Sequence, residues 1–168
     1  MSCPSTLMRL APIFISATLL LAGPSTTSSE NVSALFQDAK SVAADLKRDV
    51  VEMETYSRSS VTWKSHAMQI NTIVEHINKA GQLAARLANC RSAAEPWQQI
   101  AIDRLTPTLR ELASNVEAMI ARINKQTNMV DLNYNKYLKA NEELANELYN
   151  LISDTVDYDK TKAKMQKL

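Results

Sequence analysis

Two side chains that could hold a cofactor, the imidazole of His66 and the thioether of Met53, flank the same polar break in the sequence, near residues 57–60. If each lies on a helix that ends at this break, the two stand at similar height on neighbouring helices. A histidine and a methionine in this relation hold haem in helical-bundle b-type cytochromes, and the pair also suits copper. Met119 is expected near the same layer. The candidate cofactor-binding residues are therefore His66, Met53, Met119 and Tyr137.

A purely structural role is the alternative for the same residues. Met53 and Met119 fall on apolar stripes, where methionine commonly fills the core. His66 would then hydrogen bond to Tyr137 or to a helix carbonyl. His76 lies beside Lys79 on the flank of its helix, and we expect it to be solvated. Under this interpretation the protein holds neither cofactor nor metal.

Other catalytic patterns are missing from the sequence. Covalent haem attachment needs Cys-x-x-Cys-His, but Cys90 is the single cysteine after the N-terminal segment. Di-iron bundles need Glu-x-x-His, whereas Trp63 and Ile73 stand three residues before the two histidines. No His-Glu-x-x-His motif occurs, and one late glycine cannot build a phosphate loop. The sequence therefore predicts that the protein is not an enzyme.

Acidic residues gather at several places but have basic residues within a turn. The groups are Glu52 with Glu54, Glu142 with Glu143, and Asp154 with Asp157 and Asp159. Such interspersed charge is typical of a solvated helix surface. The formal net charge of +1 also argues against nucleic acid or an anionic membrane as the main partner.

The N-terminal segment has the pattern of a secretory signal peptide. Arg9 precedes an apolar run over residues 10–22, and a small polar stretch follows. This run is shorter than the roughly 20 apolar residues of a membrane-spanning helix. We expect a signal peptide over residues 1–28, cut within 22–29, and an exported protein, periplasmic or secreted, with no membrane span or lipid anchor. Cys90 would then be a lone thiol, either tolerated at the surface or paired with another chain.

The rest of the chain has helical periodicity. From residue 32 onward, apolar residues recur at steps of three and four, with polar breaks near 57–60, 89–96 and 126–131. Sheet folds need glycine or proline at many turns, but the chain after residue 25 has only one glycine and two prolines. The sequence predicts an all-α protein, an antiparallel up-down-up-down four-helix bundle over 31–168. The expected helices span about 32–57, 60–91, 93–126 and 131–164.

Several residues give expectations about helix ends and interiors. Ser59 or Ser60 would cap the second helix, and Ser92 with Glu95 has the form of a capping box for the third. Pro107 would kink the third helix unless a fresh helix starts at Thr106. In the fourth helix, opened by Asp131, the inward positions are expected to be Tyr137, Asn141, Leu144, Leu148, Leu151, Ile152 and Thr155. Among them, Asn141 would fix the register between helices.

The two ends of this bundle are expected to differ. Gly81 and several alanines lie toward the Cys90 end, where the missing side chain of Gly81 would permit close approach of the backbones or leave room for Trp97. Toward the other end the inward residues are bulky: Met53, Tyr56, Trp63, His66, Ile70, Met119, Ile123, Tyr134 and Tyr137. We therefore expect any binding site at the bulky end.

Short stretches in three of the predicted helices form a pattern seen in other proteins. They are Trp97-Gln98-Gln99, Ala101-Ile102-Asp103-Arg104, Pro107 and Glu111-Leu112-Ala113 in the third, Trp63-Lys64-Ser65-His66 in the second, and Asp154-Thr155-Val156-Asp157-Tyr158 in the fourth. This pattern is similar to uncharacterised exported helical-bundle proteins of bacteria. The resemblance implies an exported bundle and brings no assigned activity.

The sequence thus favours an exported, non-enzymatic bundle that acts as a binding or structural module through a protein partner or self-association. Four apolar residues off the core stripe support this function: Val51, Met68, Ile100 and Ile102. Two other functions stay open. One is a haem or copper carrier that uses Met53 and His66, and the other is a periplasmic chaperone.

Overall fold

A computed structural model describes residues 31–57, 62–125 and 132–167 of the protein. The described residues form four long helices, α1 (Val32–Ser57), α2 (Trp63–Asn89), α3 (Pro96–Lys125) and α4 (Leu132–Met165), with a short 3₁₀ helix, η1 (Arg91–Ala93), between α2 and α3. None of these helices is long and apolar enough to span a membrane. The expected signal peptide lies outside the described residues.

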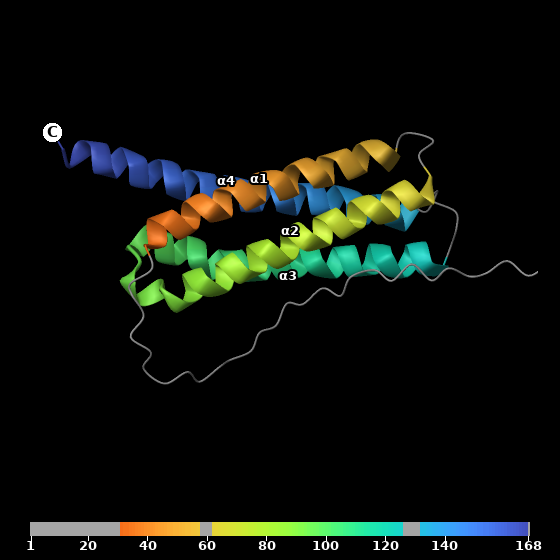
Figure 1. Ribbon diagram of the computed structural model, residues 1–168, viewed down its shortest axis with the longest axis horizontal. Coiled ribbons are helices and arrows are strands. Elements are labelled where there is room, and N and C mark those ends of the chain that lie inside the picture. The colour runs from red at the N-terminus through yellow and green to blue at the C-terminus, as the bar shows by residue number, and fades with distance from the viewer. Residues whose placement is uncertain (1–30, 58–61, 126–131, 168) are drawn as a thin grey trace, which may run out of the picture.

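The helices form a closed ring around one core. Each helix packs against the next one in the chain, and α1 also packs against α4. Figure 1 shows α1 and α3 running in one direction and α2 and α4 in the other. The predicted all-helical four-helix fold is confirmed.

The core is built from the apolar stripe of each helix. Its largest fully buried side chains include Phe36, Leu46, Ile77, Leu112 and Leu138. Burial of such stripes supplies most of the free energy that holds long helices together. Of the four apolar residues expected off the stripe, Val51, Met68 and Ile100 are exposed, but Ile102 is buried at 4% exposure.

Gly81 does not mark a close approach of helices, and that prediction is wrong. The residue is half-buried, and a Cβ added there would meet no heavy atom within 4 Å. The buried row of α2 follows Ala80, Ala84 and Leu87 instead. This row lies one step around the helix from Gly81, so Gly81 lies at the edge of the buried face of α2.

The helix caps differ from those predicted. In α2 the N-cap is Thr62, whose Oγ1 accepts a hydrogen bond from the Ser65 N–H at 3.4 Å. The candidate caps Ser59 and Ser60 lie outside the described residues, as does Asp131.

The capping box of α3 was predicted at Ser92 and Glu95, but the corresponding residues lie three positions later, at Glu95 and Gln98. The Glu95 N–H donates to Gln98 Oε1 at 2.9 Å, and Pro96 occupies the first helical position. The shift arises because η1 already occupies Arg91–Ala93. Pro107 lies inside a continuous α3, so no fresh helix starts at Thr106.

Asn141 is buried among apolar residues of α4 with only half of its amide satisfied. Its side chain donates to the Met119 sulfur at 3.3 Å, while the buried Oδ1 has no hydrogen-bond partner among the described residues. An unsatisfied buried acceptor costs about 1–3 kcal/mol. This cost is consistent with the expectation that Asn141 serves register and not stability.

The variant Asn141→Leu should therefore raise the free energy of unfolding by about 1 kcal/mol, because it removes the orphaned acceptor. Urea titration followed by circular dichroism measures the change. Asn150→Leu, at an exposed position of α4, is the matched control and should alter stability by less than about 0.5 kcal/mol. A loss of stability in Asn141→Leu would contradict this account.

Candidate functional site

At the end where a site was expected, His66 is part of the core. Its side chain is buried, and Nδ1 lies 3.1 Å from the hydroxyl oxygen of Tyr134. Removal from water lowers the pKa of His66 and raises the pKa of Tyr134. Both groups are therefore held in their neutral forms.

Tyr137 or a helix carbonyl was expected to hydrogen bond to His66, but a different tyrosine makes this contact. Tyr134, one turn earlier on α4, contacts the imidazole. The Tyr137 ring is half-buried and lies 5.6 Å from the guanidinium of Arg122. Sequence spacing placed both tyrosines near the bulky end but could not decide which one faces α2.

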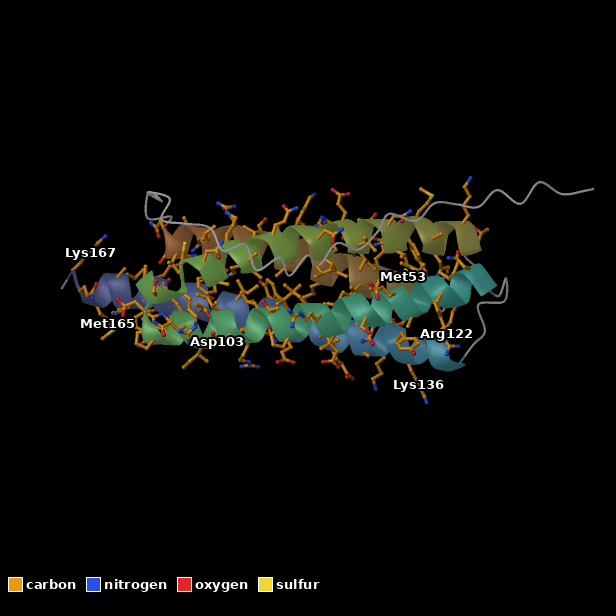
Figure 2. All side chains as sticks on the ribbon, turned by 90° about the horizontal axis from the view of Figure 1, so that it is seen from below. Met53, Asp103, Arg122, Lys136, Met165 and Lys167 are labelled. Carbon is orange, nitrogen blue, oxygen red and sulfur yellow. The ribbon has the colours of Figure 1, made fainter. Side chains whose placement is uncertain are left out.

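The two methionines are fully buried. Met53 lies between the helices on the side of the bundle that carries Arg122 and Lys136 (Figure 2), and Met119 accepts the Asn141 hydrogen bond. The described part of the chain contains no group of three or more His, Cys, Asp or Glu side chains that could hold a metal ion.

The buried, neutral state of His66 predicts a dependence of stability on pH. Because the folded pKa lies below the unfolded value of 6.5, the unfolded chain takes up a proton first as the pH falls. The free energy of unfolding should thus decrease below about pH 6.5, until the pH passes the folded pKa. Urea midpoints at pH 7.5 and 5.5 measure the effect, which should be smaller in His66→Gln. An equal decrease in both proteins would contradict it.

His76 is not solvated, contrary to the prediction. Its Nδ1 lies 2.5 Å from Asp49 Oδ2, and the two side chains are 15% and 6% exposed. The Gln69 side chain also donates to the Asp49 carbonyl at 3.0 Å. Asp49 interrupts the apolar stripe of α1, and it is buried because α2 brings a histidine to meet it.

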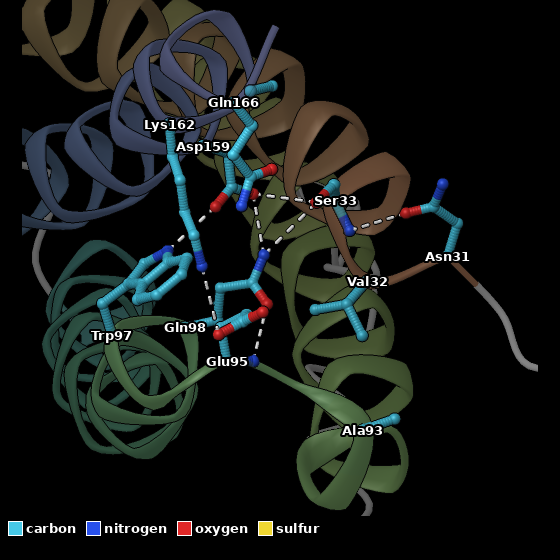
Figure 3. Close-up of a pocket in the computed structure, with 11 residues that line it drawn as sticks. Asn31, Val32, Ser33, Ala93, Glu95, Trp97, Gln98, Asp159, Lys162 and Gln166 are labelled. Carbon is cyan, nitrogen blue, oxygen red and sulfur yellow. Dashed lines mark hydrogen bonds and ion pairs between the residues drawn. The ribbon is translucent and has the colours of Figure 1, made fainter.

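The described residues also form an open pocket at the opposite end of the bundle. It lies where α1 and α3 begin and α4 ends, and has a volume of about 580 Å³ (Figure 3). We call it the Trp97 pocket. The side chains that define its chemistry are Ser33, Glu95, Trp97, Gln98, Asp159 and Lys162.

Asp159 of α4 accepts hydrogen bonds from residues of α1 and α3 in the wall of the Trp97 pocket. Its Oδ1 accepts from Trp97 Nε1 at 2.8 Å, and its Oδ2 accepts from Ser33 Oγ at 2.8 Å and Gln98 Nε2 at 2.7 Å. The sequence had grouped Asp159 with Asp157 as a solvated cluster. That holds for Asp157, which is 61% exposed and paired with Lys40, but is wrong for Asp159.

The indole of Trp97 is held on its other sides as well. The Tyr158 ring packs against it edge to face, with 4.9 Å between ring centroids. The Lys162 ammonium lies 4.0 Å from the indole centroid and 3.4 Å from Glu95 Oε2. The pocket therefore presents an immobilised aromatic face that carries a positive charge.

Sequence analysis missed this pocket, although two signals were present. Proline is common at the first position of a helix, so Pro96 places Trp97 in the first turn of α3, at one end of the bundle. The predicted up-down topology brings the end of α4, and with it Asp159, to the same place. The individual polar residues looked like ordinary surface, so nothing in the local pattern joined them.

Trp97 also borders a second groove, of about 600 Å³, between α3 and α4. There the Arg104 guanidinium bridges to Glu147 at 2.7 Å, and Ile100 is exposed. The first pocket is the better candidate site because a hydrogen-bonded network of Ser33, Gln98 and Asp159 lines it.

Neither a protein-family model, nor a curated protein, nor a solved structure has significant similarity to the chain. The resemblance to exported bacterial bundles stays a prediction. The candidate site therefore rests on its own geometry.

Proposed function

We propose that the protein is an exported, non-enzymatic binding module whose ligand site is the Trp97 pocket. The observation that supports this most is the fixation of the Trp97 ring at the mouth of an open pocket. A hydrogen bond to Asp159 and the edge of Tyr158 hold it there. An aromatic ring fixed before binding loses little entropy when a ligand contacts it.

The charged groups of the Trp97 pocket favour binding over catalysis. Asp159 already accepts three hydrogen bonds, so both of its carboxylate oxygens are engaged within the protein. Glu95 and Lys162 neutralise each other at 3.4 Å. A general acid or base needs a perturbed group facing a reacting atom, and this arrangement offers positioning and charge instead.

The test is a survey of ligand classes by NMR. The protein is labelled with ¹⁵N, and the indole signals of its two tryptophans are assigned with Trp97→Leu. Organic cations, carboxylates, sugars and nucleotides are then titrated in turn. We expect one class to move the Trp97 indole signal to saturation while the Trp63 signal stays in place. If no class moves the Trp97 signal, the pocket is not a ligand site and the proposal fails.

A second candidate function is a haem or copper carrier at His66 and Met53. It is favoured by the burial of His66, because the neutral imidazole is the form that binds metals. Against it, Nδ1 is engaged with Tyr134. Protein purified from cells supplied with haem and copper should then show a Soret band or bound copper that is lost in His66→Ala. The absence of both would exclude this carrier.

Export is tested separately from binding. Cell fractionation should find the protein outside the cytoplasm and lacking the first 22 to 28 residues, as a cut within 22–29 implies. Recovery of the uncut chain from the cytoplasm would contradict the signal peptide.

A further inference from the structure

We infer that the ligand of the Trp97 pocket is an organic ammonium ion and that Lys162 occupies its place in the free protein. This inference rests on the proposed function and adds the chemical class of the ligand.

The position of the Lys162 ammonium indicates what the pocket binds. Its Nζ lies 4.0 Å from the Trp97 ring centroid, well inside the range of about 6 Å over which a cation is attracted to an aromatic face. Glu95 Oε2 lies 3.4 Å from the same nitrogen. An aromatic face and a carboxylate thus converge on one cationic centre (Figure 3). These are the groups that recognise amines and quaternary ammonium ions.

The charge of the pocket supports the same ligand class. Lys162 is the one basic residue among those that line it, and the acidic ones are Glu95 and Asp159. When Lys162 moves aside, both remaining charges are negative. An anionic ligand would meet two carboxylates, whereas a cation would restore the balance.

Lys162 is able to leave, while the rest of the site stays in place. Its side chain is 34% exposed and belongs to the last turns of α4. Trp97 and Asp159 are joined to each other and to neighbouring helices. With Lys162 in place the pocket still has a volume of about 580 Å³, within the usual range of ligand sites, about 300–1,000 Å³.

A metal ion is a poorer match than an organic cation. The oxygens of Asp159 are already used by three neutral donors, so that carboxylate has little capacity to coordinate. An organic ammonium ion needs no coordination by Asp159, because the indole face and Glu95 supply its contacts.

The test compares choline with its neutral carbon isostere, 3,3-dimethyl-1-butanol, and uses n-butylammonium as a second cation. Each is titrated into the protein while the Trp97 indole signal is followed by NMR. We expect saturable binding of at least one cation, and binding of the isostere weaker than that of choline by about tenfold. Lys162→Met should bind the cation about tenfold more tightly, because the competing ammonium is gone. Glu95→Gln should weaken it.

Lys136→Met is the matched control, since this exposed lysine lies at the other end of the bundle (Figure 2). It should leave the affinity unchanged. Circular dichroism verifies that each variant is folded. Equal affinity for choline and the isostere overturns the ammonium inference, and unchanged affinity in Lys162→Met overturns the role given to Lys162. If the cations fail but another ligand class moves the Trp97 signal, the pocket stands and this inference falls. If nothing moves it, both fall.

Discussion

Replacing His76 with leucine is expected to lower the free energy of unfolding by about 3 kcal/mol. The change leaves Asp49 buried without the partner that now lies 2.5 Å away. Leaving a buried acceptor without its hydrogen-bond partner costs about 1–3 kcal/mol, and more when the acceptor is charged, because the group stays desolvated. Arg48 lies 3.9 Å from the other Asp49 oxygen but is 68% exposed, so it offsets only part of the loss. We therefore expect a loss near the upper end of this range.

A double-mutant cycle in urea tests this prediction. Asp49→Leu with His76→Leu removes both polar partners, and the double variant should be more stable than His76→Leu alone. Lys79→Leu, at an exposed position of α2, is the control and should change stability by less than about 0.5 kcal/mol. If His76→Leu were no less stable than the control, the contact between His76 and Asp49 would not contribute to stability.

Asp159→Ala is expected to lower the free energy of unfolding by about 3 kcal/mol and to release the end of α4. The side chains of Trp97, Ser33 and Gln98 all lose their acceptor. Hydrogen bonds to a charged group contribute about 1.5–3 kcal/mol each. The sum is not realised in full, because the site borders an open pocket and water replaces some of the lost contacts.

Asp157→Ala is the matched control, two residues away on the same helix. Asp157 makes an exposed ion pair with Lys40, and such pairs contribute about 0–1 kcal/mol. Urea titration gives the stability of both variants, and the Trp97 indole signal reports the local change. A similar loss of stability in the two variants would contradict the special role of Asp159.

The fold could be predicted because it depends on repetition. Long stretches without glycine or proline, with apolar residues at helical spacing, leave little except a helical bundle. It was harder to predict which row of residues on each helix faces the core. In α2 two parallel rows compete, one through Gly81 and one through Ala80, and a single-helix projection does not distinguish them. The position of the neighbouring helix decides which of the two rows is buried.

The candidate site, and the buried contact between Asp49 and His76 outside it, could not be predicted for a related reason. Asp49 and His76 are 27 residues apart, and Ser33 and Asp159 are 126 apart. Each residue viewed alone on its helix resembles ordinary solvated surface. Only the register between helices turns such residues into partners. The bulky residues around His66 attracted attention in the sequence, and Met53, Met119 and Tyr134 among them lie in the core.

The contact between α1 and α4 also has a consequence for how the chain folds. When each loop closes in an otherwise unfolded chain, bringing Ser33 and Asp159 together costs about 1.4 kcal/mol more in chain entropy than bringing Asp49 and His76 together. During synthesis, α1, α2 and α3 emerge before α4 exists to cover them. Until then one apolar flank of α1 and one of α3 face water. The last helix to be made therefore completes the core, and a chain stalled before α4 would be prone to aggregate.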